Sequence, residues 1–347
     1  MAFLFGFLNV GIYNGGWINI CEYTHGKWKN RLCLILLIAD SSTVIFSALY
    51  FKFISNQWLY FQLFGLLVNV LGLIGAFILP ESPEYLYSFY RFDECRDVLE
   101  EVNRWNKKED WVENYEFDVE VDLRQIKFKN AVADKHEEYR YSVFKGEEHR
   151  KQIELRKSVK ASIREFINSE EPLLWNLSMC MIVWAVIIMN YQINDYYDDS
   201  YEGDTFDDDI YLTIVELFGF IFGELIFEFL GNHRFKKIFI SCFIWSQLCS
   251  IGLIINDPDT HPTLDITLNY LCKFAIAAQF QVAYLVVELF PVVFSSTTFG
   301  MCMFAGMVSS FISVSIYVNE TRLDYGYVVG LCVIGIIASA LIKEKPI

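Results

Sequence analysis

Long apolar blocks, each close to the length of a bilayer crossing, constrain this chain more than any other feature. A helix that spans the hydrocarbon core needs roughly 20 apolar residues. Nine such blocks cover residues 3–20, 32–51, 59–79, 173–193, 210–230, 238–255, 268–290, 293–318 and 327–342. Backbone polar groups in hydrocarbon need partners within their own segment, so the blocks predict α-helices. The sequence therefore predicts an all-α, polytopic membrane protein with about nine transmembrane helices.

A long polar segment divides the blocks into three and six. We expect a partial N-terminal bundle over 1–80, a polar and partly helical inner loop over 81–171, and a six-helix bundle over 172–347. Prolines 80 and 83 lack N–H donors and should end the third helix, and 93–106 should form an amphipathic helix.

The composition supports the membrane environment and excludes other partners. Hydrophobic residues make up 54% and charged residues 20% of the chain, whereas soluble domains have about 45–50% apolar residues. The lipid bilayer is therefore the expected partner. A formal net charge of -15 argues against binding to nucleic acid, whose phosphates attract a basic surface.

Lysine and arginine gather in alternate connections, which predicts the orientation of the helices. The basic connections are HGKWKNR, the 81–171 segment, GNHRFKK and the C-terminal IKEKPI, whereas NDYYDDSYEGDTFDDD and NDPDTHPTLD contain neither residue. Lys52 and Arg322 are the exceptions. The basic side is the cytosol for a plasma-membrane protein, or the matrix for one in the mitochondrial inner membrane, and both locations stay open.

Several charged residues lie inside apolar blocks, where they face a cavity or a partner. Lys273 either lines a polar pathway or pairs with an acidic side chain. Glu216, Glu224 and Glu228 fall near one helix face, which predicts an acidic stripe towards the bundle, a coupling-ion site, or a gate at Glu228. Asp40 either pairs with a cation or carries protons, or it forms a hydrogen-bond network with Ser41, Ser42 and Thr43. The candidates for a substrate pathway are Lys273, Asp40, Glu216, Glu224 and Gln279.

No motif of an enzyme, a cofactor site or a metal site stands out. The sequence contains no CxxC pair, glycine-rich phosphate loop, nucleophile elbow or HExxH motif, so we expect no catalytic activity, cofactor or metal. The acidic run from Asp198 to Asp209 has EF-hand-like spacing, but its twelfth position is Asp where the EF-hand loop has Glu. We predict a solvated outer loop, with a calcium site as the alternative. Trp184 and Tyr191 are interpreted as interfacial anchors.

Three segments resemble the organic cation transporter family of the major facilitator superfamily. The box PESPEYL with the following SFYRFDECRDVLEEVNRWN is similar to the loop after that family's sixth helix. The segment LCKFAIAAQFQVAYLVVELFP resembles its tenth helix, and CEYTHGK the end of its fourth. The resemblance marks as gating or motif residues Glu22, Pro80, Glu81, Ser82, Pro83, Glu228, Gly231, Arg234, Glu288 and Pro291.

The resemblance implies an incomplete major-facilitator-like bundle that lacks the first three helices. Ser295 stands where the family has an arginine, and Met307 where it often has a charged residue. Two functions follow as alternatives. One is transport of a small organic solute by alternating access, which three further helices upstream would complete. The other is a transport-inactive structural subunit that contacts other membrane subunits.

Overall fold

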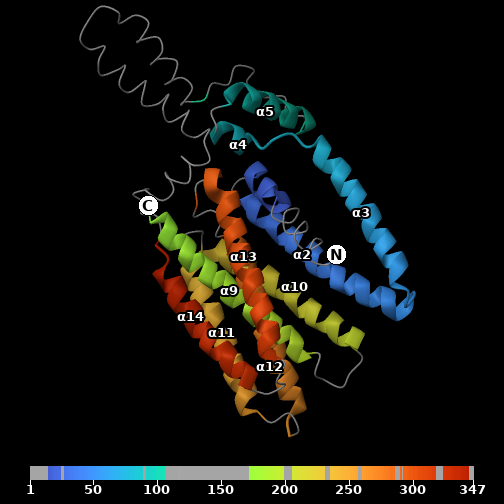
Figure 1. Ribbon diagram of the computed structural model, residues 1–347, viewed down its shortest axis with the longest axis vertical. Helices are drawn as coiled ribbons and strands as arrows, with labels where there is room; N and C mark the ends of the chain where they lie inside the picture. The colour runs from blue at the N-terminus through green and yellow to red at the C-terminus, as the bar shows by residue number, and fades with distance from the viewer. Residues whose placement is uncertain are drawn as a thin grey trace, which may run out of the picture. The chain divides into compact units, whose positions relative to one another are not determined.

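The computed structural model describes residues 15–24, 27–88, 91–106, 117, 172–198, 205–230, 235–256, 260–285, 290, 292–317 and 323–343. Within these ranges every regular element is a helix, as expected for an all-α protein. The helices are α2 (Lys27–Phe53), α3 (Trp58–Ile78), α4 (Pro83–Ser88), α5 (Phe92–Asn106), α9 (Leu173–Asp198), α10 (Thr205–Leu230), α11 (Phe235–Ile255), α12 (Pro262–Leu285), α13 (Val292–Tyr317) and α14 (Leu323–Leu341) (Figure 1). A short helix over residues 15–23 precedes α2.

Six of these helices are long and apolar enough to cross a membrane, namely α2, α3, α9, α10, α11 and α13. The chain therefore has the helices of an integral, multi-pass membrane protein. Of the other three expected crossings, 3–20 lies mostly outside the described residues. The helix α12 contains Asp265 and Lys273, which lower its hydropathy, and the apolar part of α14 spans only Gly326–Leu341. Six crossings are thus supported by length and composition, rather than nine.

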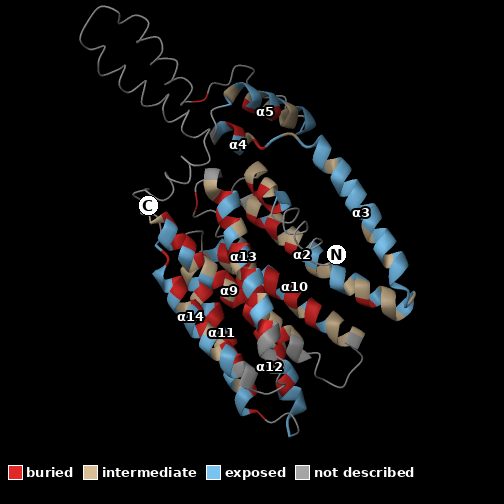
Figure 2. Cartoon of the chain, viewed as in Figure 1, coloured by how far each residue is buried: buried red, intermediate tan, exposed pale blue. Residues whose placement is uncertain are grey.

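The chain divides into two compact units, Met1–Ile74 with Leu174–Ile347 and Gly75–Leu173. In the first unit α12 packs against α10, α11 and α2, while α14 packs against α11. Buried residues recur along α9 and α10, whereas α3 is mostly exposed (Figure 2). The polar side chains of α12 are mostly buried, among them Asn269, Lys273, Gln279 and Gln281. Hydrocarbon cannot satisfy such groups, so a helix with this sequence is stable in a membrane when other helices surround it.

The helices α10 and α12 approach each other closely at two glycines, Gly219 and Gly223. A Cβ added at Gly219 would lie 2.6 Å from the Cβ of Ala277, and one added at Gly223 would lie 2.7 Å from the carbonyl oxygen of Ala278. Glycines four residues apart facing alanines form the GxxxG type of membrane helix contact, in which the lack of side chains lets two backbones meet.

The helix α3 differs from the others because it has no buried residue. Leucine, phenylalanine and valine side chains cover most of its surface, as expected for a helix that faces lipid. One stripe along it carries small and polar residues instead, at the spacing of one helix face: Gln62, Gly65, Asn69 and Gly72. An added Cβ at Gly65 or Gly72 would meet nothing within 4 Å.

In the second unit the PESPEYL box forms the start of α4. The N–H of Tyr85 donates to the Ser82 hydroxyl oxygen at 3.1 Å, so Ser82 is the N-cap and Pro83 is the first helical residue. Arg91 then pairs with Glu81 at 2.8 Å and with Glu94. The predicted end of the third helix near Pro80 is confirmed, since α3 stops at Ile78.

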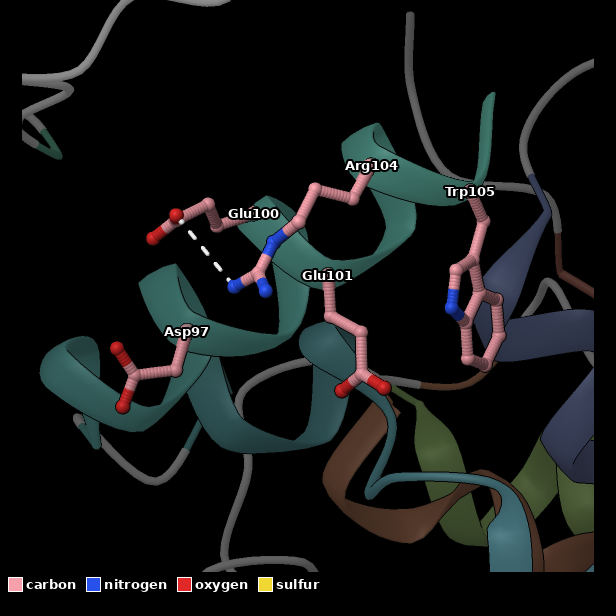
Figure 3. Close-up of a pocket in the computed structure, with 5 residues that line it drawn as sticks. All are labelled: Asp97, Glu100, Glu101, Arg104 and Trp105. Atoms are coloured by element: carbon pink, nitrogen blue, oxygen red, sulfur yellow. Dashed lines mark ion pairs between the residues drawn. The ribbon is translucent and has the colours of Figure 1, made fainter. Parts of the chain in front are cut away.

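The helix α5 is amphipathic, as predicted. It buries Cys95 and Val98 and exposes a charged face. That face includes a hollow of about 410 Å³ lined by Asp97, Glu100, Glu101, Arg104 and Trp105 (Figure 3). Arg104 lies 3.5 Å from Glu100, one helical turn away, so the hollow belongs to a solvated helix surface.

Candidate functional site

The ammonium of Lys273 lies at the centre of the most strongly charged buried site among the described residues. It donates a hydrogen bond to the carboxylate of Asp195 in α9, and its Nζ lies 3.7 Å from Oε2 of Glu216 in α10. The same Nζ lies 3.3 Å from the centre of the Tyr191 ring. Lys273 is only 1% exposed, so these partners replace the water that a buried ammonium otherwise needs.

Glu216 links this site to α2. Its Oε2 accepts a hydrogen bond from the Tyr191 hydroxyl at 3.1 Å, and its Oε1 accepts one from the Ser41 hydroxyl at 2.8 Å. We refer to the five side chains, Ser41, Tyr191, Asp195, Glu216 and Lys273, as the lysine cluster. The side chain of Asp195 is 34% exposed whereas that of Glu216 is 8% exposed, so Asp195 is the more accessible carboxylate.

A second polar group lies further along the same two helices. In α10 Glu224 follows Glu216 by eight residues, and in α12 Gln281 follows Lys273 by eight. The side-chain amide of Gln281 donates to Oε2 of Glu224 at 2.8 Å and lies 3.5 Å from the carbonyl oxygen of Asn30 in α2. We call Asn30, Glu224 and Gln281 the glutamate group. A rise of 1.5 Å per residue places it about 12 Å from the lysine cluster.

Ion pairs join α2 to α10 near both ends of their contact. Lys52 near the end of α2 lies 2.6 Å from Asp207 at the start of α10, and Arg31 at the start of α2 lies 3.6 Å from Glu228 near the end of α10. The two helices are therefore antiparallel. Lys52, an exception in the lysine and arginine pattern, is matched by an acidic partner.

The structure brings some of the predicted pathway residues together and separates others. Lys273 and Glu216 share the lysine cluster, and Glu224 belongs to the glutamate group. Asp40 lies on an exposed part of α2, and its neighbour Ser41 makes the contact with Glu216. Gln279 is fully buried, and neither atom of its amide has a hydrogen-bond partner among the described residues.

The motif residues from the family resemblance lie in several places. Glu22 is partly exposed near the end of the helix over 15–23, and Glu228 pairs with Arg31. Pro80, Glu81, Ser82 and Pro83 lead into α4. Gly231, Arg234, Glu288 and Pro291 lie outside the described residues, as do residues 199–204 of the acidic run with EF-hand-like spacing.

The structure corrects the interpretation of Trp184 as an interfacial anchor: it is 2% exposed and contacts Phe280 and Phe299 edge to face, so it belongs to the core. Tyr191, interpreted in the same way, instead contacts Lys273 and Glu216. Asp195 is a site residue that the sequence pattern assigns to the outer acidic connection. The four-residue spacing of Tyr191 and Asp195, which puts both on one face of α9, is the signal that could have found them.

Comparison with known proteins gives no relative: no protein-family model and no curated protein matches the chain. In the part of the chain that the structure describes, no three histidine, cysteine or acidic side chains gather as metal ligands. The site is thus defined by its own chemistry: buried charges on α9, α10 and α12, bonded through Ser41 to α2.

Proposed function

We propose that this chain is a transporter-like membrane protein that resembles the organic cation transporters of the major facilitator superfamily. In this proposal nine transmembrane helices, arranged as three plus six, form an incomplete bundle that moves a small organic solute by alternating access. The observation that carries it is the lysine cluster, because buried charges inside a membrane protein mark a pathway for ions or solutes. The cluster lies where α2, from the first three helices, meets three of the last six.

The contact between α2 and α10 supports a moving interface. Its terminal ion pairs have partly exposed side chains, 50% and 33% for Arg31 and Glu228, and 23% and 48% for Lys52 and Asp207. Exposed pairs contribute only about 0.2–1 kcal/mol, so neither ion pair adds much to the free-energy cost of opening its end. The lysine cluster between them is the site that such opening would expose to one side and then to the other.

The test uses the full chain in liposomes with a panel of small organic cations and anions. A Lys52→Cys, Asp207→Cys variant places one thiol on each helix at the positions of this ion pair, and a bifunctional thiol reagent that attaches to both through disulfide bonds would join α2 to α10. We expect uptake by the wild type, loss of uptake in the cross-linked variant, and recovery on reduction. The single Lys52→Cys variant treated with the same reagent is the control. A folded wild type that takes up no solute in the panel contradicts transport.

A structural role is the second candidate, and α3 is the observation that favours it. Its stripe of Gln62, Gly65, Asn69 and Gly72 contains no buried residue, although small and polar residues in membranes usually mark contacts between helices. A subunit of a membrane complex would use such a stripe against another protein. Purification in mild detergent tests this role: a fixed ratio to other membrane subunits supports it, and a monomer that transports a solute excludes it.

A further inference from the structure

We propose that Glu224 is a proton-binding site, and that its carboxyl group carries the proton while α2, α10 and α12 are in contact. Coupling of this proton to solute movement rests on the proposed function, whereas the binding of the proton does not. The inference starts from the different surroundings of two acids on one helix face, Glu216 and Glu224, which are both only 6% exposed.

Glu216 has the surroundings of an ionised carboxylate. An ammonium lies 3.7 Å from its Oε2, and two hydroxyl groups donate to its two oxygens. A positive charge and two donors stabilise the anionic form. Among the described residues Glu224 has one hydrogen-bond donor, the neutral amide of Gln281, and no basic group within ion-pair distance. A buried carboxylate with so little compensation is costly, and protonation removes the charge.

Two buried oxygen atoms of the glutamate group lack a hydrogen-bond donor among the described residues, and this is a second, independent observation in favour of a proton on Glu224. Oε1 of Gln281 and Oδ1 of Asn30 are buried, and neither has a hydrogen-bond partner in the described part of the chain. Gln281 is 0% exposed and Asn30 is 5% exposed, so bulk water does not reach them. A buried acceptor without a donor loses its hydrogen bonds to water and gains none in return, which is unfavourable. A protonated Glu224 adds one O–H donor to a group that is short of donors, while its second carboxyl oxygen still accepts from the Gln281 amide in its present orientation.

The orientation of Gln281 favours a proton over a metal ion. Its amide turns the nitrogen towards the Glu224 carboxyl group at 2.8 Å, and the amide oxygen lies on the other branch of the same carbon. A cation held by the carboxylate would therefore meet amide hydrogens, which repel it, rather than an additional oxygen ligand. A proton forms a covalent O–H bond with one carboxylate oxygen and needs no further ligand.

The charged and titratable neighbours come from each helix around Glu224. On α2 these are Lys29, Arg31 and the buried Cys33, and on α10 there is Glu228. Arg31 is engaged with Glu228 at 3.6 Å. In the described part of α12 the side chain that meets Glu224 is the neutral Gln281.

Release of the proton follows when Arg31 and Glu228 separate and water reaches Glu224. The O–H bond of Glu224 then breaks and the proton passes to water. Arg31, released from Glu228, compensates the charge of the new carboxylate.

Infrared difference spectroscopy of the full chain in nanodiscs tests the site directly. A protonated carboxylic acid has a C=O stretch that is separate from the carboxylate and amide bands. We expect this band in the wild type at neutral pH, its loss in Glu224→Gln, and its persistence in Glu216→Gln, the matched control on the same helix face. Glu224→Asp retains the acid and should shift the band, which provides a second variant if Glu224→Gln does not fold.

Each result decides the inference separately from transport. A band that depends on Glu224 supports it even when no solute is transported. Absence of the band, or its survival in folded Glu224→Gln, overturns it even when transport is observed. A sodium site at Glu224 would overturn the proton assignment. It would give a carboxylate signal from Glu224 together with thermal stabilisation by Na⁺. That stabilisation would be absent in Glu224→Gln and absent when choline replaces Na⁺. If transport is found, a matching loss of its pH dependence in Glu224→Gln supports coupling.

Discussion

Gly219 of α10 lies directly against Ala277 of α12, so that a Cβ at Gly219 would be 2.6 Å from the Cβ of Ala277 and 2.7 Å from the carbonyl oxygen of Phe274. This contact lies between the lysine cluster and the glutamate group along α10. Because Lys273 and Gln281 meet Glu216 and Glu224 across the same two helices, the distance between the backbones at Gly219 sets the geometry of both polar sites.

Replacement of Gly219 by alanine should destabilise the protein. The new methyl group forces α10 and α12 apart, and overpacking of this kind costs about 1–3 kcal/mol. Gly330→Ala in α14 is the matched control, since nothing lies within 4 Å of its added Cβ and alanine is favoured over glycine in a helix by about 0.5–1 kcal/mol. All nine cysteines are buried, so a thiol-reactive dye reports unfolding in detergent. Equal unfolding temperatures for both variants would contradict the close contact.

Removal of the Lys273 ammonium should be more severe. Lys273→Met leaves Asp195 and Glu216 without their buried cation, and loss of one partner from a buried ion pair costs about 3–5 kcal/mol. The double variant Lys273→Met, Glu216→Gln should recover part of this loss, because it also removes the more deeply buried carboxylate. The same dye assay measures both. A double variant less stable than Lys273→Met would show that Glu216 does not depend on the lysine.

Alkylation of Cys95 should have an unusual pH dependence. Burial against α4 raises the pKa of this thiol, which lies in α5 outside the membrane-spanning helices. A raised pKa leaves less thiolate at a given pH. The alkylation rate of folded protein should therefore continue to rise beyond about pH 8.5, the pKa of an ordinary cysteine, where an exposed thiol begins to level off. Mass spectrometry of the peptide with Cys95 gives the rate, and Cys95→Ser is the control. A plateau at the ordinary pKa is the contrary result.

Labelling of sealed vesicles tests the predicted orientation. Trp28 is 67% exposed at the start of α2, and Asp208 is partly exposed at the start of α10. Trp28→Cys and Asp208→Cys should react with a membrane-impermeant maleimide from opposite sides, because Lys and Arg gather near the first position and acidic residues near the second. The wild type is the control, since its thiols are buried. Reaction of both variants from the same side would mean that the orientation is wrong.

The membrane helices could be predicted from the length of their apolar blocks, and the acidic face of α10 from its periodicity, because both are local properties of the sequence. The eight-residue spacing of Glu216 and Glu224 is enough to place them on one face. Their partners could not be predicted, because these depend on how far α12 is shifted along α10. That shift pairs Glu216 with Lys273 and Glu224 with Gln281, and it is set by the contacts at Gly219 and Gly223.

The same limit applies to the side chains of α2 and α9. Asp40 and Ser41 are adjacent, and only the rotation of α2 against α10 decides that the hydroxyl rather than the carboxylate faces Glu216. Trp184 occurs in an apolar block, where aromatic composition alone does not distinguish a core position from one at the lipid headgroups. The packing of Phe280 and Phe299 around Trp184 makes that distinction, and it is a tertiary property.

The polar composition of α12 has a consequence for the biogenesis of the protein. A segment with Asp265, Asn269, Lys273, Gln279 and Gln281 partitions poorly from the translocation channel into lipid by itself. Its binding partners α9, α10 and α11 are all synthesised earlier and can already be in the bilayer when α12 emerges. In the proposed nine-helix arrangement, insertion of α12 is a step of tertiary assembly, in which Glu216 and Asp195 receive Lys273 as the helix leaves the channel.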